Sequence, residues 1–184
     1  SQRINPRVKR CIFYIILLLT ILIIGCNSEG DKKPNISVSE AKKTLENINK
    51  GLVAKDREKI EAYIERHKLD SINENQSGLF YLIWGEPSGP KPVTGNIVIL
   101  DYKLSLLDGT LCYTSQNGKP KEFMVGHGGV ESGLEMGILL MHQGQHAKFI
   151  LPPHLAHGLL GDSDKIPPRS IIVYDIHLLS VIAN

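Results

Sequence analysis

Motifs of the common enzyme chemistries are missing from this sequence. There is no GxSxG nucleophile elbow and no HExxH zinc signature, and GHGG at 126–129 lacks the Lys and Ser/Thr of a phosphate-binding P-loop. Cysteine is scarce, with three among 184 residues. Cys11 and Cys26 fall in the N-terminal segment, so Cys112 has no partner for a bridge. The chain is therefore not a disulfide scaffold.

An excess of charge of one sign is also missing. The chain carries 21 basic and 19 acidic residues, a formal net charge of +2. Four basic residues lie within the first ten positions, so the chain without residues 1–25 has 17 basic against 19 acidic residues, a balance of −2. No basic patch with interleaved aromatics appears, which argues against nucleic acid as a partner.

The N-terminal segment has the pattern of a secretion signal. A basic opening, SQRINPRVKR, precedes the uncharged run CIFYIILLLTILIIGC at 11–26. Because this run is shorter than the ~20 residues of a spanning helix, we predict a cleaved signal peptide at 1–25. The ending IIGC resembles a bacterial lipobox, which would make Cys26 a lipidation site and 26–36 a polar tether; the alternative is a plain signal with an incidental cysteine. Asn27 in place of Asp favours the outer membrane, facing the periplasm.

Residues 37–69 are expected to be helical. Ser37 and Glu40 form a capping-box pattern, and one helix face carries a stripe of apolar side chains at Ala41, Leu45, Ile48 and Leu52. Gly51 is the weak point, so the segment is either one long helix or two shorter ones. The stripe is expected to pack on the following domain or on a partner helix, as in a dimer.

The sequence of the remaining chain, 75–184, is typical of an α+β domain. After a loop at 70–78, strands are predicted at 79–84, 96–107, 110–115, 122–125, 146–151 and 171–182. The segment 131–142 places Leu134, Ile138 and Met141 on one helix face and is the only helix predicted in this half. Several antiparallel strands around one short helix define the fold class.

Seven histidines invite a metal-site interpretation, which their spacing does not support. His142 and His146 are four residues apart but are separated by Gly144, and His154 and His157 have only two nearby aspartates as further ligands. Surface or hydrogen-bonded histidines are the prediction, with no metal. Cys112, between Leu and Tyr on a predicted strand, is expected to be a small buried residue rather than an activated thiol.

A family resemblance emerges from several runs together: GNIVILDYKLSLLDGT, KEFMVGHGGVESGLEMGILLMHQGQHAKFILPPHLAHG and KIPPRSIIVYDIHLL. In order and spacing, from about Gly95 to Leu179, they resemble the FKBP-type peptidyl-prolyl cis-trans isomerases. The resemblance implies an antiparallel β-sheet curved around one short helix, here preceded by a long N-terminal helix. The lipobox and charged helix resemble envelope-anchored bacterial members, including gliding-associated and macrophage-infectivity-potentiator-like lipoproteins.

An isomerase of this kind needs no nucleophile and no cofactor, which fits the missing motifs. Rotation about an Xaa-Pro bond requires loss of amide resonance, a barrier of ~18–20 kcal/mol, and a dry pocket that prefers the twisted amide can lower it. The resemblance implies catalytic pocket residues at Tyr102, Val130, Ile166 and Tyr174, and substrate-binding residues at Cys112, Tyr113, Leu134 and His157. The PPHLAHG-to-IPP loop would be the flap over this pocket, with His157 as its polar group.

The pocket also departs from the family pattern. Cys112 and Tyr113 replace an aromatic residue and an Asp, and further replacements are Lys121 for an aromatic residue, Glu131 for Ile, Leu134 for Trp and His157 for Tyr. We therefore expect weak catalysis on proline-containing polypeptides of the cell envelope, and binding of FK506-type macrolides if the pocket is intact. The alternative is a non-catalytic chaperone, or a scaffold lipoprotein of a gliding or secretion machine.

Overall fold

The computed structural model describes residues 37–115 and 119–183. The predicted signal peptide at 1–25 and tether at 26–36 lie outside the described residues. The chain divides into two compact units, Ser1–Leu45 and Glu46–Asn184. Within the described ranges, no helix combines the length and the hydropathy that crossing a membrane requires.

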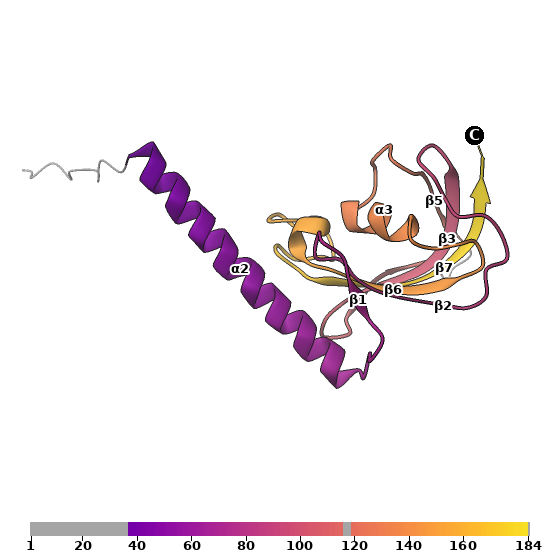
Figure 1. Cartoon of the computed structure of the whole chain (residues 1–184), viewed down its shortest axis with the longest axis horizontal. Coiled ribbons are helices and arrows are strands. Elements are labelled where there is room, and N and C mark those ends of the chain that lie inside the picture. Colours follow the sequence, from indigo (N-terminus) through magenta and orange to yellow (C-terminus); the bar gives the residue numbers. More distant parts are fainter. Residues whose placement is uncertain (1–36, 116–118, 184) are drawn as a thin grey trace, which may run out of the picture. The chain divides into compact units, whose positions relative to one another are not determined.

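Helix α2 runs from Val38 to Arg66 without a break at Gly51, so the segment is one long helix (Figure 1). Its start is the predicted capping box. The Glu40 amide donates to Ser37 Oγ at 3.2 Å, and the Ser37 amide donates to the Glu40 carboxylate at 3.1 Å. These two bonds satisfy donors that a helix N-terminus otherwise leaves open.

The face by which α2 contacts the domain differs from the predicted one. In the predicted stripe at 41–52, Ile48 is 52% exposed, so this side chain does not pack on the domain. The buried side chains lie further along, at Asp56, Ile60 and Tyr63. Ile60 and Tyr63 belong to an apolar cluster that also contains Phe80, Ile150, Ile171 and Val173. Ile60 and Tyr63 thus attach the C-terminal half of the helix to the sheet.

The domain is built on one antiparallel sheet. Its strands are β1 (Asn73–Glu74), β2 (Phe80–Trp84), β3 (Ile97–Leu106), β4 (Leu111–Thr114), β5 (Lys121–Met124), β6 (His146–Leu151) and β7 (Ile172–Ile182). The order is β1-β2-β6-β7-β3-β4, and β5 also pairs with β3. Short β1 falls in the segment predicted as a loop at 70–78. The long central strands β3 and β7 pair over ten positions, so side chains on their common face meet in pairs.

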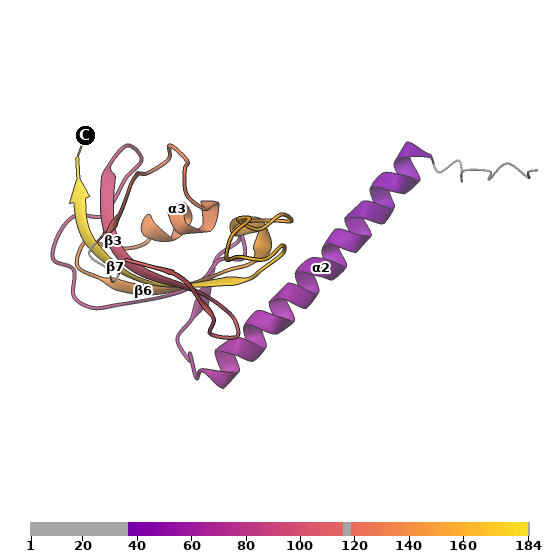
Figure 2. The same ribbon diagram turned by 180° about the vertical axis from the view of Figure 1, so that it is seen from behind.

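Helix α3 (Ser132–Ile138) lies in the concave side of the curved sheet, as both views show (Figures 1 and 2). Strand alternation separates the two faces: Phe149 belongs to the core under α3, whereas Ile150 belongs to the cluster that contains α2 residues. A Cβ on Gly137 would stand 2.4 Å from the Phe149 ring, so glycine allows the close helix–sheet approach. The fold class is the predicted one.

The predicted helix at 131–142 is shorter than expected. It ends at Ile138, after which the amides of Leu140 and Met141 form tighter i→i+3 bonds. Leu134, Ile138 and Met141 are all fully buried, as the helix periodicity predicted. The chain leaves the helix early and still brings Met141 into the core.

Candidate functional site

Two small cavities lie side by side between the sheet, the residues just before α3 and the loop at 153–170, and we call them the paired cavities. They share Lys121, Glu131 and His157. One, of about 240 Å³, is also lined by Tyr102, Leu104, Tyr113, Asp162 and Tyr174. The other, of about 390 Å³, is also lined by Gly129, Val130 and Ala156. The three shared side chains form the boundary between them.

The aromatic wall of the paired cavities comes from the two central strands. Tyr102 on β3 pairs with Ile176 of β7, and Leu104 pairs with Tyr174, so the two tyrosines are diagonal neighbours on one face. Their ring centroids are 5.8 Å apart with the planes at 52°. Lys121 Nζ lies 5.3 Å from the Tyr102 ring centroid, within cation–π range. The wall is therefore aromatic with a cation at its edge.

A carboxylate stands in this wall. The Glu131 side chain is 7% exposed, and its Oε1 accepts a 3.0 Å hydrogen bond from the Tyr174 hydroxyl. His157 Nε2 lies 2.8 Å from the same oxygen, but the two groups are not oriented as a hydrogen bond. Burial is the main cause that raises the pKa of both Tyr102 and Tyr174, and the negative charge of Glu131 is the second cause. Both hydroxyls therefore stay protonated at neutral pH.

The loop at 153–170 is organised around a second carboxylate, Asp162. Its Oδ1 accepts bonds from the amides of Asp164 at 2.9 Å and Ile166 at 2.7 Å, and its Oδ2 accepts a short bond from the Tyr113 hydroxyl. Burial opposes ionisation of Asp162, but the bond from Tyr113 and the two amide bonds outweigh it and lower the pKa to about 2. Because this carboxylate bonds to Tyr113 of β4, it holds the loop against the sheet.

Helix α2 reaches the same loop through an ion pair. Arg169 Nη2 donates to Asp56 Oδ2 at 2.7 Å, with the side chains 31% and 10% exposed, respectively. The backbone of Arg169 has φ +57° and its amide donates to Gly158 O at 2.9 Å. Gly158 directly follows His157, which lines the paired cavities. The Asp56–Arg169 ion pair is therefore linked to the cavity lining through the backbone hydrogen bond between Arg169 and Gly158.

Most predicted pocket residues meet at this site. Tyr102, Tyr113, Val130, His157 and Tyr174 line the paired cavities. The other three predicted residues, Cys112, Leu134 and Ile166, are buried in the core behind the lining.

Burial raises the pKa of the Cys112 thiol, and the charge of Asp162 adds to this, so the thiol is not activated. The prediction missed four lining residues: Leu104, Gly129, Ala156 and Asp162. Leu104 could have been found by its i, i+2 spacing from Tyr102 on one strand face. Asp162 carried no such signal, because its role depends on the loop conformation.

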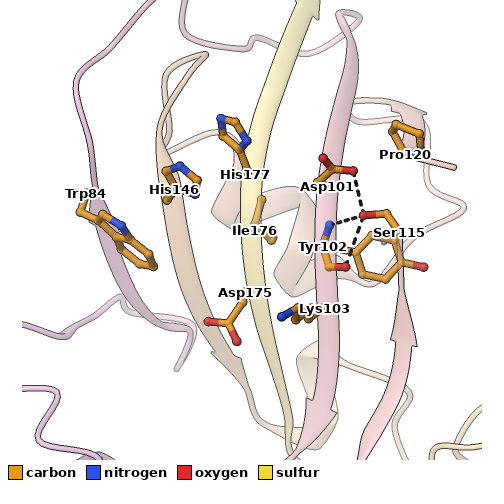
Figure 3. A pocket seen from close by; sticks show the side chains of 10 residues that line it. All are labelled: Trp84, Asp101, Tyr102, Lys103, Ser115, Pro120, His146, Asp175, Ile176 and His177. Atoms are coloured by element: carbon orange, nitrogen blue, oxygen red, sulfur yellow. Dashed lines mark hydrogen bonds between the residues drawn. The ribbon is translucent and has the colours of Figure 1, made fainter. Parts of the chain in front are cut away.

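A larger cavity of about 640 Å³ lies on the sheet face that points away from α3 (Figure 3). Trp84, His146, His177 and Asp101 are direct cross-strand partners on β2, β6, β7 and β3, so they form a row across the sheet. Adjacent rings stack, with centroids 5.9 Å apart for Trp84 and His146 and 4.1 Å apart for the two histidines. Burial, then the neighbouring His146, lowers the pKa of His177.

This larger cavity is distinct from the predicted pocket. Besides the row, its lining includes Lys103 and Asp175, and it shares only Tyr102 with the paired cavities. Within residues 37–115 and 119–183, no group of three or more His, Cys, Asp or Glu side chains could hold a metal ion. The paired cavities, on the α3 side of the sheet, are the ones that combine an aromatic wall with buried apolar side chains behind it.

Comparison with known proteins identifies the family of this site. A profile described as FKBP-type peptidyl-prolyl cis-trans isomerase matches residues 89–179, which include every residue that lines the paired cavities. FK506-binding protein 2 of Yarrowia lipolytica is 36% identical over 113 residues, covering 61% of this chain and 78% of that protein. This chain belongs to the FKBP-type peptidyl-prolyl cis-trans isomerase family.

A bacterial relative and a solved structure support the same family assignment. A probable FKBP-type isomerase, FkpA, of Neisseria meningitidis serogroup B is 33% identical over 128 residues, covering 68% of this chain and 46% of that protein. The chain thus spans about half the length of this curated relative. The crystal structure of AtFKBP13 matches with a TM-score of 0.57 at 30% identity, covering 60% of this chain and 98% of that one. The FKBP-like fold is confirmed.

Proposed function

We propose that this chain accelerates the cis/trans isomerisation of Xaa-Pro bonds, with proline bound in the paired cavities. The observation that carries the proposal is the diagonal Tyr102–Tyr174 pair at 5.8 Å, backed by buried Leu134 and Ile166, in a chain of the FKBP-type family. Two aromatic faces over an apolar base provide a site into which a proline ring can be transferred out of water.

Such a site can act without a nucleophile. The planar amide is stabilised by resonance, and the twisted amide of the transition state has a less polar carbonyl. A water-poor pocket therefore favours the twisted amide over the planar one, which lowers the barrier. Tyr102 is half-buried and Tyr174 is fully buried, so their rings contribute the apolar surroundings. Neither hydroxyl has to lose a proton for this mechanism.

The polar side chains of the paired cavities support a second proposal, that turnover is slow. Each aromatic side chain buries ~150–250 Å². Lys121 stands where the resemblance places an aromatic residue, and Glu131 where it places an isoleucine, so contact area is reduced. Lys121→Phe should therefore raise kcat/KM on an uncharged Leu-Pro peptide. An unchanged or lower kcat/KM in a folded variant would contradict this explanation of slow turnover.

Exchange spectroscopy of peptides tests the isomerase activity directly. We would measure cis/trans exchange of an Ala-Leu-Pro-Phe peptide by NMR with the full chain in mild detergent. Acceleration should fall at least tenfold in Tyr102→Leu, which removes one face of the site, and should persist in Tyr81→Leu, a tyrosine on β2 outside the cavity lining. Exchange at the uncatalysed rate with folded wild type would refute the activity.

We further propose that the protein works in the bacterial cell envelope as a lipoprotein anchored through Cys26, assisting the folding of exported proteins. The supporting pattern is the basic opening and uncharged run that end in IIGC. Metabolic labelling with a palmitate analogue should mark the wild type and leave Cys26→Ser unlabelled. Wild type that remains unlabelled and fractionates with soluble proteins would contradict the anchor.

The close contact of Glu131 with His157 favours a second candidate function, a binding module that holds chains without isomerising them. This contact lies on the boundary of the two cavities, at 2.8 Å. A site divided in this way could capture a segment and release it unchanged, as a chaperone or a scaffold of an envelope machine would. Peptide-induced NMR shifts at Tyr102 without accelerated exchange would support this candidate over the isomerase.

A further inference from the structure

Glu131 is a buried charge with half of its bonding capacity unused. Oε1 has contacts with Tyr174 and His157, whereas within the described residues no donor reaches Oε2, which is itself buried. Glu131 precedes α3, yet its side chain makes no capping bond to that helix. A buried carboxylate oxygen without a donor is costly to keep, so a ligand that supplies a donor gains free energy on binding.

Proline cannot supply that donor. Its ring carries only carbon substituents and its nitrogen has no hydrogen in an Xaa-Pro bond. The donor must come from a neighbouring residue of the bound chain. Lysine and arginine are pure donors with a positive charge, and charge-assisted bonds to a carboxylate are roughly twice as strong as neutral ones.

The charges around the paired cavities favour the same class of ligand. Asp162, the second carboxylate in the lining, has a pKa of about 2 and is ionised at neutral pH. The lining also contains Lys121, whose ammonium lies 5.3 Å from the Tyr102 ring centroid and makes no ion pair with either carboxylate within the described residues. An acidic side chain entering here would meet like charge, whereas a basic one would meet opposite charge.

His157 is the group that a ligand would displace. Its side chain is 26% exposed and belongs to the loop at 153–170, whereas Glu131 is fixed at the start of α3. Because both side chains line both cavities, replacing this contact by a ligand–Glu131 contact would also join the two spaces. A substrate side chain therefore competes with His157 for the same carboxylate.

We propose that Glu131 selects the substrate of this site, favouring segments in which Lys or Arg directly precedes proline. This inference rests on the proposed isomerase function and specifies its substrate class. It makes Glu131 a specificity-determining residue that contacts the substrate side chain, while the tyrosines surround the proline ring.

A matched peptide series tests the assignment with the full chain in mild detergent. Ala-Xaa-Pro-Phe peptides with Xaa as Lys, Arg, Leu or Glu differ only beside the proline, and kcat/KM is measured by exchange NMR. Wild type should prefer Lys and Arg over Leu by about tenfold, with Glu the poorest. Glu131→Gln keeps the shape and removes the charge, so the preference should fall below about twofold. Glu122→Gln, an exposed carboxylate on β5, should retain it.

Each outcome decides the proposal. Equal kcat/KM for Lys and Leu peptides in the wild type, or a preference that survives Glu131→Gln, would overturn the selection by Glu131. If no peptide is isomerised, the proposed function fails, and peptide affinities from NMR shift titration then judge the inference on their own. Tighter binding of the Lys peptide that is lost in Glu131→Gln supports it, and equal affinities refute it.

Discussion

Replacing Asp56 by asparagine should release the loop over the paired cavities from helix α2. The variant keeps the size of the side chain and removes its charge, leaving the Arg169 guanidinium without its ionic partner at 2.7 Å. Breaking a fully buried ion pair costs ~3–5 kcal/mol, and a hydrogen bond to a charged group contributes ~1.5–3 kcal/mol. Because Arg169 is 31% exposed, the lower range applies, and we expect a loss of about 2 kcal/mol.

This loss is measurable in two ways. At ~3–4 °C per kcal/mol for a domain of this size, Tm should fall by about 6–8 °C. The Gly158 carbonyl accepts from the Arg169 amide, so hydrogen exchange of that amide should also quicken, which a purely global effect on α2 would not produce selectively. Glu58→Gln, an exposed carboxylate on the same helix, is the matched control. A Tm for Asp56→Asn within 1–2 °C of this control would refute the reasoning.

Three further tests address packing, loop charge and the histidine row. Gly137→Ala should destabilise the fold by about 1–3 kcal/mol, because the added Cβ would stand 2.4 Å from an aromatic ring. Gly51→Ala, with no atom within 4 Å of the added Cβ, should instead stabilise the fold by about 0.5–1 kcal/mol. Equal changes in the free energy of unfolding, measured by urea denaturation, would contradict the packing argument. The pKa of Asp162 is about 2 in the fold and ~3.9 when unfolded, so its contribution is complete above about pH 4 and is lost as the pH falls towards 2. Asp162→Asn should flatten the dependence of Tm on pH in that window, and a curve parallel to wild type would count against it. His177 should titrate below ~6.5 by NMR, and Asp101→Asn should lower its midpoint further because the Asp101 charge raises it; an upward shift would reverse the assignment.

The elements of the domain could be predicted from sequence because their periodicity is set by burial on one face. Strand β6 was predicted with its observed bounds, and Leu134, Ile138 and Met141 proved fully buried. The contact face of α2 was not predictable in this way. Ile48 of its most regular apolar stripe is exposed, while a charged residue, Asp56, is buried in an ion pair with Arg169. Periodicity does not reveal a partner more than a hundred positions away.

The candidate site was predictable only as far as the family pattern extends. Tyr102, Val130 and Tyr174 lie on regular elements, so matching the motif also locates their side chains. Asp162 and Glu131 depend on loop conformation and on what fills the space left by replaced residues. Glu131 departs from the family pattern, but its bond to the Tyr174 hydroxyl follows only from the three-dimensional arrangement.

The single tryptophan gives this protein an unusual optical property. Trp84 stacks on His146 on the sheet face away from α3, and Leu134 stands where the family pattern places a tryptophan. We therefore expect its emission to report on the histidine row. A ligand entering the paired cavities would instead change tyrosine emission, because Tyr102, Tyr113 and Tyr174 all line them. Tryptophan emission thus observes the sheet face that points away from α3.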